Sequence, residues 1–279
     1  MTYQELWHRL VPQYYNEGEA KAVARMVYEI RYGLTLSDLL MGRDKDVPHD
    51  ELEPLAVRLE QGEPVQYVLG VAEFCGRSFH VESGVLIPRP ETTELCRLIA
   101  RQATVNDRQP APIMLLDIGT GSGSIAITLA LELPQAEVTA WDISDKALQV
   151  ARGNAERLGA HVLFKRQDAL LPPDDNCCWD IIVSNPPYVC EREKEQMETG
   201  VLDWEPSLAL FVPDDNPLLF YRSIGRYAMR ALKPEGRLFL EINEHYGEQT
   251  AKLLKDIGFR HVAIAKDFYD KDRFVTAYR

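Results

Sequence analysis

The tetrapeptide Asn185-Pro186-Pro187-Tyr188 combines residue types that can hold a planar amino group. It follows the apolar run 179–184, which is typical of a buried strand. Pro186 restricts Asn185 to extended backbone, because a proline ring clashes with a helical residue before it. We expect Asn185 Oδ1 and the Pro186 carbonyl to accept the two hydrogens of an –NH2 group, with the Tyr188 ring packed against its plane. On the tetrapeptide alone, an ordinary turn at the end of a strand is an equal alternative.

A glycine-rich turn lies upstream, at the end of a predicted strand over 113–117. It reads Asp117-Ile118-Gly119-Thr120-Gly121-Ser122-Gly123. Gly119 and Gly121 let the backbone turn tightly and approach a ligand without interference from a Cβ atom. Asp117 can orient this loop or meet a cationic amino group. The spacing differs from the dinucleotide motif G-x-G-x-x-G, because Ser124 takes the position of its third glycine.

Two further carboxylates follow predicted strands. Asp142 ends a strand over 138–142, where an acid can accept hydrogen bonds from a ribose diol. Asp168 follows a strand over 162–165 and suits contact with the exocyclic amine of adenine, although a solvated loop carboxylate is an equal alternative. Ligands of open α/β sheets bind at the carboxyl ends of the strands, so these acids, the glycine turn and Asn185 predict one site at that edge.

The elements that must position these residues alternate after residue 110. Strands are predicted at 113–117, 138–142, 162–165, 180–184, 237–242, 261–265 and 274–278, and helices at 124–133, 145–158, 218–232 and 246–257. Ser144 is a candidate N-cap for the second of these helices. This alternation predicts an α/β fold with a parallel, doubly wound sheet covered by helices on both faces.

The first part of the chain has a different pattern. Residues 1–70 predict a small all-helical domain, with a capping box at Thr2 and Glu5 and a helix end at Gly33. Residues 71–90 predict an extended or hairpin linker with glycine turns. The sheet domain then takes residues 91–279.

Composition limits the classes of function. Lys and Arg number 31 and Asp and Glu 43, a net charge of −12, and no basic cluster stands out, which argues against nucleic acid as a direct partner. The apolar runs are far short of the roughly 20 residues that a membrane span needs, and the start of the chain lacks a signal-peptide pattern. Five cysteines without C-x-x-C spacing favour reduced thiols in the cytoplasm over disulfides or zinc. No metal site is expected.

Glycine turn, ribose acid, third-strand acid and Asn-Pro-Pro-Tyr stand in an order that resembles the S-adenosylmethionine-dependent amino methyltransferases. The segment Pro88-Arg89-Pro90-Glu91-Thr92 resembles, more specifically, a signature of the peptide chain release factor glutamine-N5 methyltransferases. Three other segments resemble the same family: 62–70, 84–88 and 205–210. The resemblance spans nearly the whole chain.

This resemblance implies a Rossmann-like methyltransferase sheet, S-adenosylmethionine as cofactor, and class 1 peptide chain release factors as protein substrates, methylated on the glutamine of their Gly-Gly-Gln loop. The helical domain would help to dock the factor. Cofactor contacts are expected from Asp117, Gly119, Thr120, Gly121, Ser122, Gly123, Asp142, Asp168, Ala169 and Asn185. Catalysis is expected from Asn185, Pro186 and Tyr188, and substrate binding from these three and Pro187.

The chain departs from the family at two places. Family members often carry an aromatic residue at the position of Ala169, and their Gly-Gly-x-Asp-Gly is replaced here by residues 211–216. Two alternatives remain at this stage: an adenine-N6 DNA methyltransferase that uses the same corner on a flipped base, and a noncatalytic adaptor that keeps the fold. A nicotinamide dehydrogenase ranks last because the glycine spacing is wrong.

Overall fold

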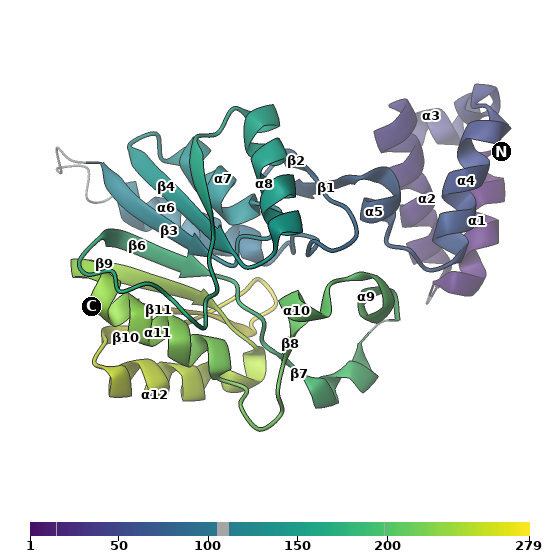
Figure 1. The fold of residues 1–279 in the computed structure, drawn as a ribbon. Coiled ribbons are helices and arrows are strands. Elements are labelled where there is room, and N and C mark those ends of the chain that lie inside the picture. Colours follow the sequence, from purple (N-terminus) through teal and green to yellow (C-terminus); the bar gives the residue numbers. More distant parts are fainter. Residues whose placement is uncertain (15, 105–111, 198) are drawn as a thin grey trace. The chain divides into compact units, whose positions relative to one another are not determined.

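The computed structural model describes residues 1–14, 16–104, 112–197 and 199–279. Its contacts divide the chain into two units, and each is described by itself (Figure 1). The first comprises Met1–Val71, Val81–Ser83 and Met197–Trp204, and the second comprises Ala72–His80, Gly84–Gln196 and Glu205–Arg279. The boundaries 1–70, 71–90 and 91–279 stay a prediction. None of the described helices is long and apolar enough to cross a membrane.

The first unit is helical. Its α-helices are α1 (Tyr3–Leu10), α2 (Glu17–Tyr32), α3 (Leu36–Leu40), α4 (His49–Glu60), α5 (Val65–Leu69) and α9 (Thr199–Trp204), with short 3-10 turns at Val11–Gln13 and Arg43–Asp46. The capping box is present, since Thr2 Oγ1 accepts from Glu5 N and Glu5 Oε2 accepts from Thr2 N. Gly33 ends α2 in the left-handed conformation that glycine tolerates. Apolar side chains from α1, α2 and α4 form its core.

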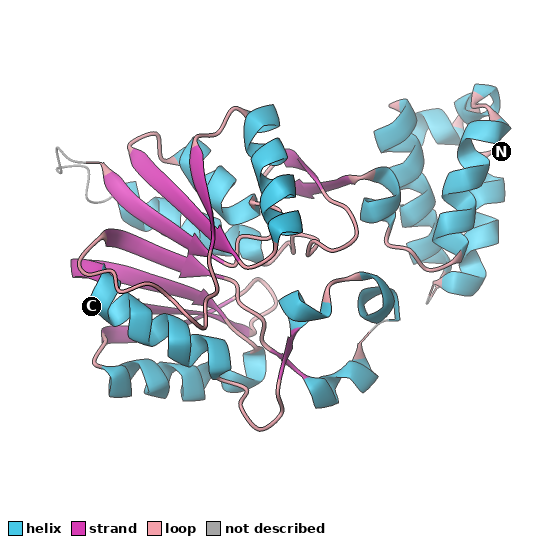
Figure 2. Ribbon diagram, in the orientation of Figure 1, coloured by secondary structure: helices cyan, strands magenta, loops and turns pink. Residues whose placement is uncertain are grey.

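The second unit is built on a seven-stranded sheet of order β10-β11-β9-β6-β3-β4-β5 (Figure 2). The strands are β3 (Ile113–Ile118), β4 (Ala136–Asp142), β5 (Val162–Arg166), β6 (Trp179–Ser184), β9 (Leu232–Glu241), β10 (Arg260–Lys266) and β11 (Asp272–Tyr278). β3, β4, β5, β6 and β9 pair in parallel. The predicted doubly wound sheet is confirmed, with one exception to its parallel order: β11 is antiparallel to β9 and β10. The five residues between β10 and β11 are too few for the crossover that parallel strands require.

Alternating side chains along the central strands bury the two faces of the sheet. Leu115 and Val183 pack with α6 (Thr92–Thr104), α7 (Ser124–Glu132) and α8 (Asp145–Leu158) on one face. Leu116 and Ile182 pack with α11 (Leu219–Ala231) and α12 (Gly247–Ile257) on the other. Strands buried on both faces are typical of the parallel sheet that the apolar runs predict.

Several short elements have no periodic apolar pattern and were not predicted. They are α10 (Ser207–Leu210), the 3-10 helices Glu191–Gln196 and Glu244–Tyr246, and the parallel pair β7 (Val189–Cys190) and β8 (Phe211–Val212). The predicted linker contains β1 (Val71–Phe74) and β2 (Arg77–His80), which form a two-stranded sheet around a turn at Cys75 and Gly76. Elements as short as α10, the two 3-10 helices, β7 and β8 are not revealed by sequence periodicity, whereas a hairpin was among the forms predicted for residues 71–90.

Replacing Gly123 with Ala is expected to lower the free energy of unfolding by about 2–4 kcal/mol. Gly123 precedes α7 with φ +84°, and an added Cβ would lie 2.7 Å from Ile127 Cδ1 and 3.1 Å from Ala151 Cβ. The matched control is Gly153→Ala on α8, where an added Cβ meets nothing within 4 Å. We expect this control to gain about 1 kcal/mol from helix propensity. Urea denaturation measures both, and equal stability of the two variants would contradict the packing role.

Candidate active site

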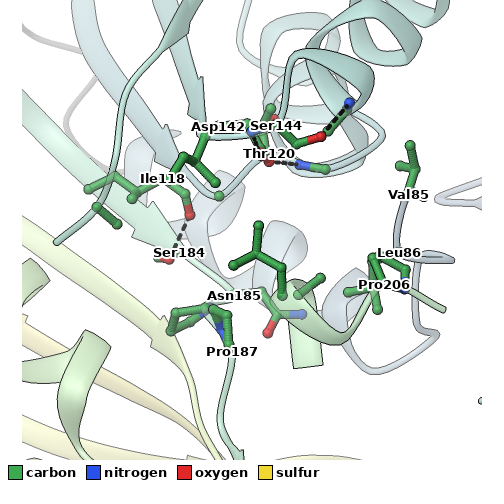
Figure 3. Close-up of a pocket in the computed structure, with 18 of the residues that line it drawn as sticks. Val85, Leu86, Ile118, Thr120, Asp142, Ser144, Ser184, Asn185, Pro187 and Pro206 are labelled. Atoms are coloured by element: carbon green, nitrogen blue, oxygen red, sulfur yellow. Dashed lines mark hydrogen bonds between the residues drawn. The ribbon is translucent and has the colours of Figure 1, made fainter. Parts of the chain in front are cut away.

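The predicted residues meet where the chain changes direction across the sheet. β3 and β6 are neighbours, yet the chain leaves β3 toward β4 and β5 on one side and returns to β6 on the other. Ligands of doubly wound sheets bind in the crevice that such a switch point opens. Here a cavity of about 380 Å³ lies at the carboxyl ends of the strands. In Figure 3, Thr120 and Asp142 line one side of it and Asn185 and Pro187 the other.

The structure brings most of the predicted site residues to this cavity. The lining includes Gly119, Thr120, Gly121, Ser122, Asp142, Asp168, Ala169, Asn185, Pro186 and Pro187. Three predicted residues are not among those that line it: Asp117, Gly123 and Tyr188.

The glycine turn is held against β4 by backbone hydrogen bonds. Both Gly119 N and Thr120 N donate to Trp141 O, at 2.9 and 2.8 Å. Gly119 has φ +77°, and a Cβ added there would lie 4.0 Å from the Asn185 carbonyl oxygen. The turn therefore runs directly beside the Asn-Pro-Pro corner.

Asp117 lies behind the turn, which explains why it does not line the cavity. Its side chain is fully buried, and Oδ2 accepts from Thr120 Oγ1 at 2.7 Å. Burial raises the pKa of this carboxyl to about 7, against the opposing effect of the Thr120 hydrogen bond. Of the two roles considered for Asp117, this position supports orientation of the loop. Gly123, likewise, packs α7 against α8.

Asp142 joins the glycine turn to the start of α8. Its Oδ2 accepts from Gly121 N and its Oδ1 from Ser144 N, each at 2.9 Å. Ser144 is the predicted N-cap, and its Oγ accepts from Ala147 N. Burial raises the pKa of Asp142, and these backbone donors oppose the shift. Each carboxylate oxygen keeps a second lone pair for the hydroxyl groups of a bound ribose.

Asp168 and Ala169 lie on the cavity wall next to α11. Asp168 Oδ1 accepts from Leu170 N at 2.8 Å, so one of its oxygens already stabilises the local turn. Ser223 Oγ donates to the Ala169 carbonyl oxygen at 2.6 Å, which fixes α11 beside this segment. Among the described residues that line the cavity, only Phe220 carries an aromatic ring. The sequence pattern gives no sign of this role for Phe220, because only the fold brings α11 to the end of β5.

The Asn-Pro-Pro corner begins where β6 ends. Ser184 Oγ donates to the Ile118 carbonyl oxygen at 2.6 Å, which ties the ends of β6 and β3 together (Figure 3). Asn185 Nδ2 donates to Thr92 Oγ1 at 3.3 Å. This contact assigns the nitrogen of the side chain to Thr92, so Oδ1 is the acceptor that remains for a ligand.

Tyr188, the last residue of the corner, is not among the residues that line the cavity. Its half-buried side chain packs against the core on the α11 face of the sheet, and its hydroxyl donates to Glu241 Oε1 at 3.3 Å. Burial raises the pKa of this hydroxyl above its usual value. The packing of Tyr188 on a substrate amide stays a prediction, and the contact that the structure gives its hydroxyl is the one to Glu241.

Another part of the cavity wall comes from the segments 84–92 and 205–210, in which no site residue is expected from the sequence. Arg89 lines the cavity and donates to Glu205 at 2.7 Å, and Ile87 N donates to the other Glu205 oxygen at 3.3 Å. The Glu205 side chain is 1% exposed. A buried acid that binds both a guanidinium and a backbone N–H holds the segments 84–92 and 205–210 together. Both segments resemble motifs of the methyltransferase family, and this resemblance is the feature of the sequence that could have identified Arg89 and Glu205 as residues of the site.

Comparison with known proteins decides the family. Residues 8–70 match the model of the PrmC N-terminal domain, and residues 103–202 match that of the methyltransferase small domain. A release factor glutamine methyltransferase of Bacteroides thetaiotaomicron is 48% identical to this chain, over 95% of each. The chain belongs to the release factor glutamine methyltransferase family. Proteins of the same name from Flavobacterium psychrophilum and Streptococcus pneumoniae are 39% and 34% identical, over 98% and 99% of this chain and 97% and 98% of theirs.

As a member of the release factor glutamine methyltransferase family, the chain is a methyltransferase whose methyl donor is S-adenosylmethionine. The cavity fits that cofactor. Asp142 would accept hydrogen bonds from the ribose hydroxyl groups, and Phe220 with Ile224 offers an apolar surface for the adenine ring. The glycine turn leaves room beside the ends of β3 and β4. S-adenosylmethionine supplies an electrophilic methyl group on a sulfonium.

Proposed function

We propose that this chain methylates the side-chain amide nitrogen of the glutamine in the Gly-Gly-Gln motif of class 1 peptide chain release factors. The observation that supports this most directly is the orientation of Asn185. Its Nδ2 is hydrogen-bonded to Thr92, so its Oδ1 is available to a primary amide in the cavity. The names of its relatives, release factor glutamine methyltransferase, support the same substrate.

The corner suits a primary amide because it offers acceptors to a group with two hydrogens. Within the described residues, neither Asn185 Oδ1 nor the Pro186 carbonyl oxygen accepts a hydrogen bond from the protein. Pro186 and Pro187 have no N–H groups that would compete with the substrate as donors. An amide nitrogen is a weak nucleophile, so positioning and stabilisation of developing positive charge are the contributions we expect from these oxygens.

This proposal includes three further points. The release factor is the partner, the helical unit is the domain that docks it, and the cytoplasm is the compartment. A protein substrate agrees with the net charge of −12, which disfavours the phosphate backbone of nucleic acid. The five cysteines are free, which agrees with a reducing compartment.

The test is transfer of a labelled methyl group from S-adenosylmethionine to purified release factor. The control is a factor in which the glutamine of the Gly-Gly-Gln motif is replaced by alanine. We expect label in the intact factor and none in the control. Label in DNA supplied as an alternative acceptor would instead support the adenine-N6 DNA methyltransferase, and cofactor binding without transfer to any acceptor would support the adaptor.

Replacing Phe220 with Ala is expected to raise the Kd for S-adenosylmethionine about 5- to 150-fold, because stacking of a base on an aromatic ring contributes about 1–3 kcal/mol. The matched control is Phe268→Ala, which removes an aromatic ring that is 77% exposed between β10 and β11. Calorimetric titration of both variants checks the prediction. An unchanged Kd for the Phe220 variant would show that Phe220 does not replace the aromatic residue missing at Ala169.

A further inference from the structure

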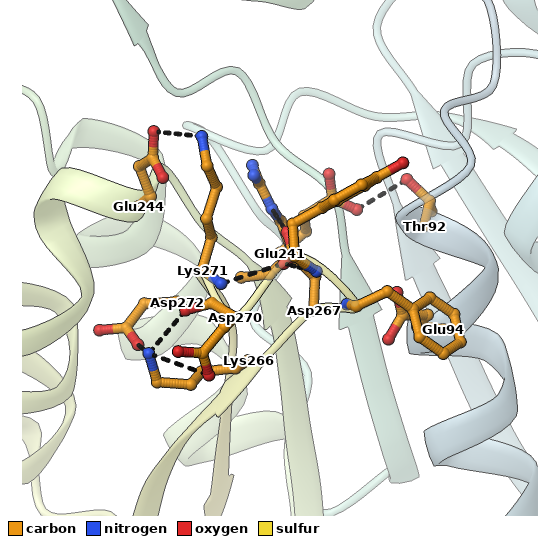
Figure 4. A network of polar contacts seen from close by, with 12 residues as sticks. Thr92, Glu94, Glu241, Glu244, Lys266, Asp267, Asp270, Lys271 and Asp272 are labelled. Carbon is orange, nitrogen blue, oxygen red and sulfur yellow. Dashed lines mark hydrogen bonds and ion pairs between the residues drawn. The ribbon is translucent and has the colours of Figure 1, made fainter.

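Asn185 is the last member of a hydrogen-bond chain that begins at a buried carboxylate. Glu241 ends β9, and its Oε2 accepts from Thr92 Oγ1 at 2.7 Å (Figure 4). Thr92 is the first residue of α6, and its Oγ1 in turn accepts from Asn185 Nδ2 at 3.3 Å. Glu241 and Thr92 are 1% and 3% exposed, so the hydrogen bond between them is shielded from water.

The number of hydrogens available in this series of hydrogen bonds determines which atom of Asn185 faces the cavity. An ionised carboxylate can only accept, and a threonine hydroxyl has a single hydrogen. Because Glu241 takes that hydrogen, Thr92 Oγ1 can act toward Asn185 only as an acceptor. The atom of Asn185 that carries hydrogens is Nδ2, so Nδ2 must face Thr92 and Oδ1 must face the cavity.

We propose that Glu241 and Thr92 are positioning residues that set the orientation of the Asn185 amide for the methyl acceptor. The two ends of an asparagine amide are nearly identical in shape, and packing alone distinguishes them poorly. With the amide reversed, Nδ2 would confront the –NH2 of the substrate, and two donors do not form a hydrogen bond. The inference deepens the proposed function and, in its kinetic test, rests on it.

The charge state of Glu241 is set by groups from several elements. Burial raises its pKa to about 7, Glu91 adds to the rise, and Arg273 on β11 and the Thr92 and Tyr188 hydroxyls oppose it. Arg273 is itself paired with Asp267 at 3.0 Å. Below about pH 7 the carboxyl holds a proton that it can donate to Thr92. The Thr92 hydroxyl can then donate to Asn185 Oδ1, so protonation of Glu241 should allow the side-chain amide of Asn185 to adopt the reversed orientation.

The decisive variant is Thr92→Val, which keeps the shape of the side chain and removes the hydroxyl. We expect kcat to fall about 10- to 100-fold, as misplacement of a reacting group does, while the Kd for S-adenosylmethionine and the KM for release factor change less than about threefold. Thr92→Ser, which keeps the hydroxyl, should recover most of the rate. Thr250→Val is the matched control, because Thr250 is a fully buried threonine of α12 whose Oγ1 has no partner among the described residues.

The pH profile separates this role from a structural one. In the wild-type chain the single-turnover rate should rise with pH through about 7 as Glu241 ionises, and the Ser variant should keep that rise. In Thr92→Val the rise of the rate with pH should disappear, because no hydroxyl links the Glu241 carboxyl to Asn185. A Val variant whose kcat stays within threefold of wild type, or a Ser variant as slow as the Val variant, would overturn the proposal.

A readout without substrate completes the test. The side-chain amide of Asn185 in 15N-labelled protein, assigned by its loss in Asn185→Ala, should titrate with a midpoint near pH 7. Thr92→Val and Glu241→Gln should abolish this titration, and Thr250→Val should retain it. A titration that persists in Thr92→Val overturns the positioning role. If the wild-type chain does not methylate the factor, the proposed function fails and the amide titration alone decides this inference.

Discussion

Replacing Asn185 with Ala is expected to lower the rate of methyl transfer about 10²- to 10³-fold, the loss typical of removing one preorganised hydrogen-bond partner. The variant loses Oδ1, which is held toward the cavity because Nδ2 is bonded to Thr92. The Kd for S-adenosylmethionine should change only a few-fold, since the Asp142 side of the cavity is untouched. Single-turnover transfer and calorimetric titration measure the two effects separately.

The matched control for this variant is Asn216→Ala. Asn216 also uses its side-chain amide, accepting from Arg222 at 2.9 Å, but it does not line the cavity. Its rate should stay close to that of the wild-type chain. A transfer rate within threefold of wild type in Asn185→Ala would contradict a catalytic role for Asn185.

Replacing Asp142 with Asn is expected to raise the Kd for S-adenosylmethionine about 10- to 100-fold, because a hydrogen bond to a charged group contributes about 1.5–3 kcal/mol. The carboxylate accepts from Gly121 N and Ser144 N on its two oxygens. An asparagine can accept on one side only, so its –NH2 group would face a backbone donor or the ribose hydroxyl groups. At saturating cofactor, kcat should change only a few-fold.

Asp145→Asn is the control for Asp142. Asp145 lies three residues further on, in the first turn of α8, and its side chain is 79% exposed beside Arg166. Exposed pairs of this kind contribute little, so the Kd should not move. A Kd that rises equally in both variants would mean that the general negative charge of this region, and not the Asp142 site, attracts the cofactor.

The order and type of the main sheet elements could be predicted because their patterns are local. β3 and β6 are apolar runs buried on both faces, and α8 has a polar N-cap at Ser144 and a glycine after its last turn. The direction of β11 was missed. Whether two neighbouring strands form a crossover or a hairpin depends on the length of the connection and on the partner that they find in the sheet.

The same division holds for the site. The sequence by itself determined the chemistry of the strand ends: a glycine turn, an acid at Asp142 and an acceptor-rich corner at Asn185, all at positions that parallel strands bring to one edge. Only the tertiary structure decided where Tyr188 points, that Phe220 joins the cavity, and that Thr92 and Glu241 hold the Asn185 amide. The physical reason is the distance along the sequence between the residues that interact. Strand periodicity and turn conformation depend on neighbours in the chain, whereas a hydrogen bond between the start of α6 and the end of β9 exists only once the sheet has assembled.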